Sequence, residues 1–344
     1  MKPTIFAPLL AVLAALTLHG QVLASDLYAG ETRLGDDEQI TPAAMLEALD
    51  QVLVRLTGMV DVSPVAVIGV RAADVNALVE SQQRLRVERL DKEGERITEV
   101  RLRVDFHPPS VDRLLQDNAL PRWGRERPAI LVWIAEEDED GARLSADPFL
   151  EQQLAEQARR FGLDVIRPLG DALDMAEVDL ADIRGGFLDA AENGMRRYQA
   201  GIVAMLDLRD SDDYWSGRWF WRLEGRDRGL NLSADSRLEI IEAGLAALLS
   251  ALAGRYGVIA DDLDHGTRRV VVDGIVDPIQ YAEVLRYLGE LSMVEGLQVV
   301  RARDRRIEFK LAVSGGRLED VIALSRLLVV DRQEFDGTLY LRLQ

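Results

Sequence analysis

Cysteine is absent from the 344-residue chain. Its absence excludes disulfide bonds, thiolate nucleophiles, lipid modification of an N-terminal cysteine and metal sites built on sulfur ligands. Catalytic signatures are missing as well, because the sequence holds no G-x-S-x-G nucleophile elbow and no phosphate-cradling glycine loop. Hydrophobic residues make up 48% of the chain, which is enough to bury real cores by packing alone. The sequence therefore predicts no cofactor and favours a folded, non-enzymatic protein.

Long apolar runs are also missing, apart from one at the N-terminus. It extends from Ile5 to Leu18, follows Lys2, and is followed by the small residue Ala24 just before Ser25. This is the layout of a cleaved secretory signal, and the run is shorter than the roughly 20 residues that span a bilayer. We therefore expect cleavage after Ala24 and no transmembrane segment in the mature chain. An exported chain without cysteine is expected in the periplasm of a Gram-negative bacterium. Secretion beyond the envelope is the alternative, since a signal peptide alone does not distinguish the two.

Basic residues are the minority. Lys and Arg number 41 against 59 Asp and Glu, and the net charge of −18 becomes −19 when the signal is removed with Lys2. Such an excess repels polyanions, so nucleic acid is not expected as a partner. From Arg268 onward the charges balance, so the acidic excess lies in the earlier part of the chain. Simple solubility is the alternative interpretation of this excess.

Hydrophobic periodicity divides the mature chain into three α+β or α/β modules separated by two connectors. The connectors are Asn118–Pro128 and Asp261–Thr267. The expected organisation is a signal peptide over 1–24, an N-terminal module over 25–118, a central module over 119–262 and a C-terminal module over 263–344.

The N-terminal module has the pattern β-α-α-β-β. Its first helix begins at the N-cap Thr41 with Pro42 behind it, and it ends at Gly58. We expect a second helix over Ala72–Gln82 and then a hairpin, since apolar residues alternate on both sides of Lys92–Glu95. This order of elements resembles that of POTRA domains, the modules that chaperone outer-membrane barrels.

The central module alternates strands with helices, which predicts a mixed-sheet α/β sandwich. Its expected strands are Ala129–Ala135, Asp164–Ile166, Gly201–Leu208, Trp215–Leu223 and Gly229–Ser233, and its helices are Phe149–Phe161, Asp182–Tyr198 and Leu238–Tyr256. The C-terminal module has the ferredoxin-like pattern β-α-β-β-α-β. Its elements are expected at Arg269–Ile275, Pro278–Leu291, Leu297–Arg301, Arg306–Val313, Arg317–Leu328 and Thr338–Leu343.

Several short segments resemble one known family. They are Asp26–Tyr28, Val52–Gly58, Trp123–Pro128, Leu131–Trp133 and the pattern Trp215-x-Gly217-x-Trp219. On these segments the mature chain resembles the exported proteobacterial family DUF2066, a domain of unknown function. The resemblance implies an envelope protein of Gram-negative bacteria and supplies no activity, cofactor or catalytic residue.

Tryptophans cluster in one predicted strand of the central module. Trp215, Trp219 and Trp221 alternate along it and share a face. Rings exposed on such a face would stack on sugars or grip a hydrophobic peptide. The alternative is that this face lies in the core under a helix.

Arginines cluster at the predicted hairpin turn of the C-terminal module. Arg301, Arg303, Arg305 and Arg306 surround Asp304. Guanidinium groups in this number suit an anionic partner, which includes the acidic modules of the same chain or of another copy. A solvated turn is the alternative.

One acidic segment and two histidines are candidate metal ligands. Glu136–Asp140 before Gly141 is similar to the start of a calcium loop, with Asp147 at the twelfth position. A solvated acidic loop is the alternative, because the flanking helices and the final glutamate of an EF-hand are missing. His107 and His265 have no further ligand at metal spacing, so no metal site is predicted.

Export, serial small modules and missing catalytic chemistry favour a non-enzymatic binding or scaffold protein. Its expected partner is an envelope protein or peptidoglycan, bound through Trp215–Trp221 or Arg301–Arg306. The alternative from a different class is a hydrolase of envelope glycans that uses two of the 59 carboxylates. A purely structural subunit is a third interpretation.

Overall fold

The computed structural model describes residues 27–35, 37–90, 95–138, 141–211, 213–259, 266–314, 317–325 and 327–344. The expected signal peptide, with its cleavage site at Ala24 and Ser25, lies outside the described residues, and so does His265. The expected fold class is confirmed, because helices accompany three separate sheets of three, six and five strands. No helix in the described part of the chain is long and apolar enough to cross a membrane.

The N-terminal module packs helices on a three-stranded antiparallel sheet of order β1-β3-β2. Its elements are β1 (Ala29–Arg33), α1 (Pro42–Thr57), α2 (Pro64–Ile68), the 3-10 helix η2 (Val75–Leu78), β2 (Val79–Leu90), β3 (Arg96–Phe106) and α3 (Pro108–Asp117). Helix α1 begins and ends as expected. The Thr41 side chain accepts a hydrogen bond from the Ala44 N–H, and Gly58 adopts a left-handed conformation with φ of 72°.

The predicted helix over Ala72–Gln82 is wrong. Only η2 is helical there, and β2 begins at Val79, where it pairs with Phe106 of β3. Strand pairing between distant residues overrides the local helical pattern. The second helix is instead α2, which starts after the N-cap Ser63.

The central module is built on the six-stranded sheet, of order β5-β4-β7-β8-β9 with β6 alongside β4. Its elements are β4 (Ala129–Asp138), β5 (Gly141–Leu144), α4 (Pro148–Phe161), β6 (Asp164–Ile166), α5 (Ala172–Glu177), α6 (Leu180–Gly185), α7 (Leu188–Tyr198), β7 (Ile202–Ser211), β8 (Tyr214–Leu223), β9 (Arg226–Ala234) and α8 (Arg237–Tyr256). The sheet is mixed, as expected, because β4 runs parallel to β6 and β7 while β7 to β9 are antiparallel.

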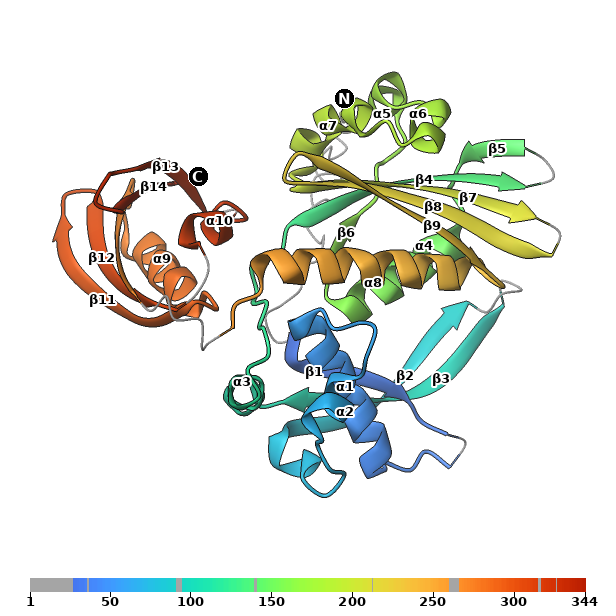
Figure 1. Cartoon of the computed structure of the whole chain (residues 1–344), viewed down its shortest axis with the longest axis horizontal. Helices are drawn as coiled ribbons and strands as arrows, with labels where there is room; N and C mark the ends of the chain where they lie inside the picture. The colour runs from blue at the N-terminus through green and yellow to red at the C-terminus, as the bar shows by residue number, and fades with distance from the viewer. Residues whose placement is uncertain are drawn as a thin grey trace, which may run out of the picture.

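Helices cover both faces of this sheet. Helices α4 and α8 bury one face, and α6 and α7 bury the other. Figure 1 shows α8 crossing the molecule between the central sheet and the N-terminal module. The helix expected over Asp182–Tyr198 is split, because the left-handed Gly186 with φ of 69° ends α6 before α7 begins.

The C-terminal module has the expected β-α-β-β-α-β order with one additional strand. Its elements are β10 (Gly266–Asp273), α9 (Pro278–Glu290), β11 (Val294–Arg303), β12 (Arg306–Val313), α10 (Leu318–Ile322), β13 (Leu328–Gln333) and β14 (Leu339–Leu343). The sheet order is β11-β12-β10-β14-β13. The helix expected over Arg317–Leu328 is therefore mostly wrong: it shortens to α10, and from Leu328 the chain forms a hairpin with β14.

Candidate functional site

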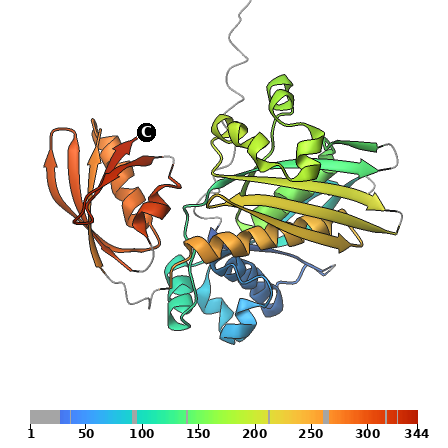
Figure 2. The ribbon, with the colours of Figure 1, turned by 45° about the horizontal axis from the view of Figure 1, so that its top comes forward.

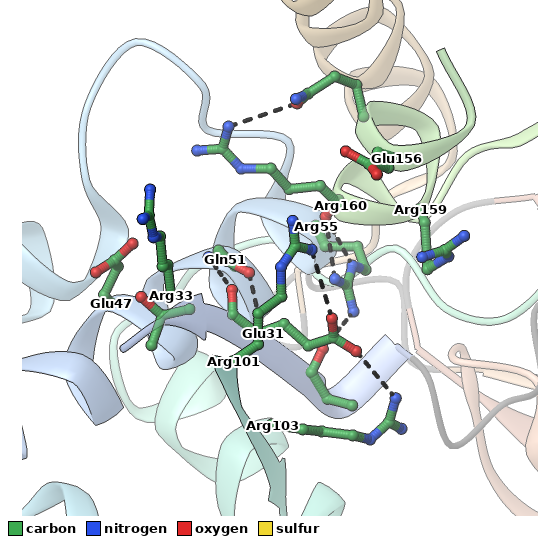
Figure 3. Close-up of a pocket in the computed structure, with 13 residues that line it drawn as sticks. Glu31, Arg33, Glu47, Gln51, Arg55, Arg101, Arg103, Glu156, Arg159 and Arg160 are labelled. Carbon is green, nitrogen blue, oxygen red and sulfur yellow. Dashed lines mark hydrogen bonds and ion pairs between the residues drawn. The ribbon is translucent and has the colours of Figure 1, made fainter. Parts of the chain in front are cut away.

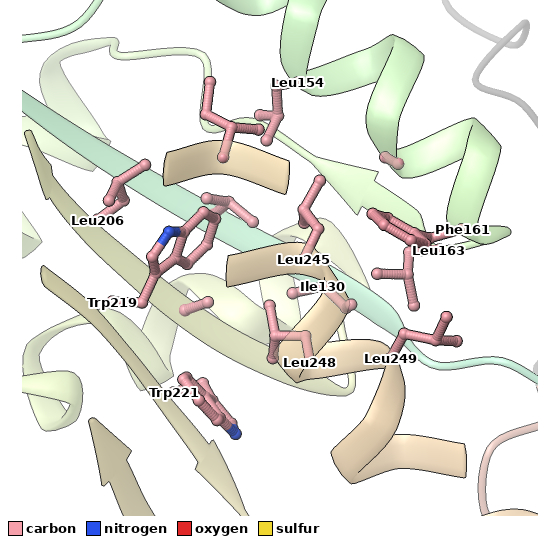
Figure 4. Close-up of a cluster of buried hydrophobic side chains, with 14 of the residues drawn as sticks. Ile130, Leu154, Phe161, Leu163, Leu206, Trp219, Trp221, Leu245, Leu248 and Leu249 are labelled. Atoms are coloured by element: carbon pink, nitrogen blue, oxygen red, sulfur yellow. The ribbon is translucent and has the colours of Figure 1, made fainter. Parts of the chain in front are cut away.

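The expected aromatic face on β8 is not exposed. Trp219 is fully buried and Trp221 is 7% exposed, and both lie in the core between the sheet and α8 (Figure 4). The indole N–H of Trp219 donates to the Ile240 carbonyl at 3.1 Å. Gly244 makes room for this ring, because a Cβ there would lie 2.1 Å from the indole nitrogen. Trp215 is partly buried against the same core, so the prediction of an exposed tryptophan platform is corrected.

Of the acidic segment Glu136–Asp140, Glu139 and Asp140 lie outside the described residues, and the described part, Glu136–Asp138, is the end of strand β4. Glu136 is buried and accepts hydrogen bonds from Ser145 at 2.7 Å and Arg237 at 3.0 Å. Glu137 pairs with Arg184 at 2.6 Å. Glu136 and Glu137 are therefore residues of strand β4, and arginines neutralise their carboxylates. The described residues contain no cluster of three metal-ligating side chains. His107 is the N-cap position of α3, where its Nδ1 lies 2.9 Å from the Ser110 hydroxyl.

The arginine turn of the C-terminal module is exposed, and it continues into one face of the sheet. Residues that face each other across paired strands share a side of the sheet. Val270, Phe309 and Leu341 are buried against α9 and α10, so their neighbours along each strand point the other way. The residues on that other side include Arg269, Val271, Asp273, Gln298, Arg301, Arg303, Arg306, Glu308, Lys310, Arg332, Tyr340 and Arg342. We call this set the open face.

The open face is strongly basic. Its two carboxylates are already paired, Glu308 with Arg269 at 3.1 Å and Asp273 with Arg306 at 2.6 Å. The hydrogen bond from Arg306 holds the pKa of Asp273 below its usual range. By contrast, the side chains of Arg301, Lys310 and Arg342 form no ion pair with any described residue. The face therefore has positive charge that the described chain does not neutralise.

The open face has a hollow and points away from the other modules. The hollow, of about 590 Å³, is lined by Arg301 and the arginine turn Arg303–Arg306, which includes Asp304, together with Val271, Asp273, Glu308 and Tyr340. Helices α9 and α10 lie on the side of the sheet turned toward the central module, where Asp320 of α10 pairs with Arg255 of α8 at 2.5 Å (Figures 1 and 2). The expectation that the arginine turn docks on the acidic modules of the same chain is therefore wrong.

A second arginine-rich site lies between the N-terminal and central modules. We call it the inter-module cavity. It has a volume of about 240 Å³ and lies between β1, α1 and β3 on one side and α4 on the other (Figure 3). Its charged lining residues are Glu31, Arg33, Glu47, Arg55, Arg101, Arg103, Glu156, Arg159 and Arg160.

Helix α1 holds the floor of the inter-module cavity in place. Gln51 binds both backbone groups of Glu31, accepting at 3.2 Å and donating at 2.7 Å. One turn further, the buried Arg55 donates to the carbonyls of Leu27 and Ala29. It also donates twice to the Arg160 carbonyl at the end of α4, at 3.1 and 3.0 Å, where a cation suits the helix dipole. Arg55 therefore joins the two modules at the cavity.

Nothing local in the sequence pointed to this cavity. The alternation of Arg101 and Arg103 on β3 and the consecutive Arg159 and Arg160 on α4 are visible in the sequence. Each pattern alone is typical of a solvated strand or helix face. Only the packing of α4 against α1 brings these arginines to one cavity.

The C-terminal module contacts the connector through a titratable cluster. Arg125 pairs with Glu290 of α9 at 2.6 Å, and Arg122 donates to the Ser292 carbonyl at 2.6 Å. Burial raises the pKa of the adjacent Glu126 to about 7, repulsion from Glu290 adds to the rise, and Arg125 opposes it. This contact is expected to respond to pH.

Acidification is expected to stabilise this contact through Glu126. The pKa in the folded chain exceeds the value near 4.3 of an unfolded chain, so ionisation costs stability as pH rises from about 5 to 8. Glu126→Gln removes this cost. The free energy of unfolding of the variant should therefore exceed that of the parent by about 2 kcal/mol at pH 8 and by little at pH 5. Urea unfolding at both pH values measures the difference. The exposed Glu80→Gln is the control, and an equal effect of Glu126→Gln at both pH values would contradict the assignment.

Comparison with known proteins identifies one family match. The model of the family described as "Domain of unknown function (DUF8605)" matches residues 22–124. The expected resemblance to DUF2066 is therefore wrong, since the family matched is a different domain of unknown function. No match was found among curated proteins. One solved structure, titled "Crystal structure of uncharacterized protein", is 13% identical with a TM-score of 0.17, over 38% of this chain and 91% of that chain. The part of the chain that resembles a known family is thus the N-terminal module with the start of the connector.

Proposed function

We propose that the chain is a non-enzymatic binding protein of the bacterial envelope, whose open face takes up an acidic polypeptide segment of another protein. The observation that carries the proposal is unneutralised positive charge on an exposed sheet face of an otherwise acidic chain. Coulomb attraction between this face and carboxylates of a partner would orient and hold the complex. The arginine turn, with Arg301, Arg303 and Arg305, forms one end of this surface.

The edge of the same sheet supports an extended partner. Strand β11 is the outermost strand, so its outer backbone groups are not paired within the described sheet. Val299 and Val300 on it are 36% and 51% exposed. An extended acidic segment can pair with this edge while its carboxylates reach Arg301 and Arg303. This mode of binding needs neither a cofactor nor a catalytic group.

The proposal includes export to the periplasm, which rests on the N-terminal segment ending at Ala24. Fractionation of cells that express the full chain, with mass spectrometry of the mature N-terminus, tests it. A mature chain that begins at Ser25 in the periplasmic fraction is the expected result. An intact N-terminus in the cytoplasm would contradict it.

Charge reversal on the open face is the test of binding. A fluorescent peptide of alternating glutamate and valine is titrated with the mature chain, and anisotropy gives the dissociation constant. Arg301→Glu with Arg303→Glu should weaken binding by about tenfold or more, because each attraction becomes a repulsion. The matched control is Arg226→Glu with Arg228→Glu, two exposed arginines of β9 outside the open face.

Three outcomes would count against this function. Equal losses in both double variants would mean that general charge, and not the open face, binds the peptide. Co-sedimentation with purified peptidoglycan that survives charge reversal at Arg301 and Arg303 would favour the glycan as partner. Release of soluble fragments from that peptidoglycan would favour the hydrolase.

In vivo crosslinking identifies the partner protein. The expected partner is the protein whose crosslink to the chain is lost when the charge at Arg303 is reversed by Arg303→Glu.

A further inference from the structure

We propose that the inter-module cavity is a binding site for a small, multiply charged anion of the phosphate-monoester or polycarboxylate class. This site lies between the N-terminal and central modules, and it is separate from the open face of the C-terminal module. The ligand would contact β1 and β3 of the one module and α4 of the other (Figure 3). The proposal therefore adds a small-molecule ligand to a protein-binding function.

The charges around the cavity are the first argument. Six arginines and three glutamates line it in a chain whose overall net charge is −18. Glu31 is engaged by Arg101 at 3.9 Å and by Arg103 at 3.5 Å. The side chains of Arg33 and Arg159, one from each module, make no hydrogen bond or ion pair with any described residue. Guanidinium groups held around one space repel each other, and a bound anion offsets that repulsion.

The rigidity of the cavity floor is the second argument. Arg55 is only 4% exposed, and its donors are committed to backbone carbonyls of both modules. Strand β1 lies so close to α1 that a Cβ at Gly30 would be 2.0 Å from the Ala48 carbonyl oxygen. The strand that presents Glu31 and Arg33 is therefore fixed against the helix. A site on rigid elements loses little conformational entropy when it binds.

Size and chemistry define the ligand class. The cavity volume of about 240 Å³ lies below the roughly 300–1,000 Å³ of drug-sized sites, so a small molecule fits. Guanidinium groups bind carboxylate and phosphate oxygens through paired hydrogen bonds. A ligand with several anionic oxygens can engage Arg33 and Arg159 together from the two sides of the cavity. Phosphate monoesters and polycarboxylates share this property.

Isothermal titration calorimetry of the full mature chain tests the proposal. Inorganic phosphate and citrate serve as the two probes, at constant ionic strength maintained with sodium chloride. The cavity variant is Arg33→Gln with Arg159→Gln, and both residues are exposed, so the fold should be retained. We expect the variant to bind the preferred probe at least tenfold more weakly than the parent. Binding of phosphate alone indicates a phosphate monoester, and binding of citrate alone indicates a polycarboxylate.

Two further variants separate this site from the open face. Arg226→Gln with Arg228→Gln is the matched control and should bind the probe as the parent does. Arg301→Glu with Arg303→Glu disables the open face and should also leave probe binding unchanged. The proposal is overturned if neither probe binds, if the cavity variant binds as well as the parent, or if only the open-face variant loses binding. If a variant loses only peptide binding, the result concerns the proposed function of the open face and does not contradict anion binding in the inter-module cavity.

Discussion

Replacing Arg55 with methionine is expected to lower the free energy of unfolding by about 3 kcal/mol or more. The guanidinium of Arg55 supplies donors to the carbonyls of Leu27, Ala29 and Arg160. Methionine fills similar space but donates nothing, and each buried carbonyl left without a donor costs about 1–3 kcal/mol. Because the Arg160 carbonyl belongs to α4, the loss should also loosen the contact between the two modules.

Urea unfolding followed by circular dichroism measures this loss, and hydrogen exchange of β1 and α4 locates it. Arg84→Met is the control, since the Arg84 side chain is exposed and, within the described residues, donates one hydrogen bond, to the Glu38 carbonyl. Its cost should stay below about 0.5 kcal/mol. Arg55→Lys should behave more like Arg55→Met than like the parent, because a single ammonium cannot reproduce the planar set of donors. Equal stabilities of the Arg55→Met and Arg84→Met variants would refute the structural role of Arg55.

Replacing Trp219 with alanine is expected to destabilise the central module by about 3–5 kcal/mol. The ring is fully buried under α8, so its removal leaves a cavity in addition to the lost apolar contact. The Ile240 carbonyl would also lose its indole donor. Neighbouring side chains cannot easily fill the space, because Gly244 opposite the ring has none of its own.

Comparison along the same strand makes the experiment specific. Trp215 is only partly buried, so Trp215→Ala should cost clearly less than Trp219→Ala in the same urea titration. The folded Trp219→Ala protein should bind the acidic peptide with unchanged affinity, since the open face lies in another module. A stable Trp219→Ala protein that loses ligand binding would restore the aromatic-platform hypothesis.

Parts of this fold could be predicted because their causes are local. Thr41, Pro42 and Gly58 delimit α1 through side-chain capping, a fixed φ and a left-handed turn, all within a few residues. The buried strand β4 followed from its continuous apolar run. The helix predicted across Ala72–Gln82 was wrong because Val79 pairs with Phe106, a residue far along the chain. Hydrophobic periodicity within a segment cannot show whether a distant strand will pair with that segment.

The candidate sites illustrate the same limit. The arginine turn was predictable, because Arg301 to Arg306 are neighbours in the chain and flank a hairpin. That it continues into the open face was not, since most of the other basic residues, Arg269, Arg332 and Arg342, come from β10, β13 and β14. The inter-module cavity was missed for the same reason. Arg33 and Arg159 line one cavity only because whole modules pack together.

The sequence by itself determined the chemistry available to this protein and much of its secondary structure. Without cysteine or catalytic motifs it excludes thiol chemistry, and its capping residues and apolar periods define most helices and strands. Which charged and aromatic side chains face solvent depends on the tertiary structure alone. Trp219 is buried under α8, whereas Arg301 and Lys310 are exposed. The physical reason is that burial and electrostatic context are set by contacts between distant segments, whereas capping and periodicity are set by neighbours along the chain.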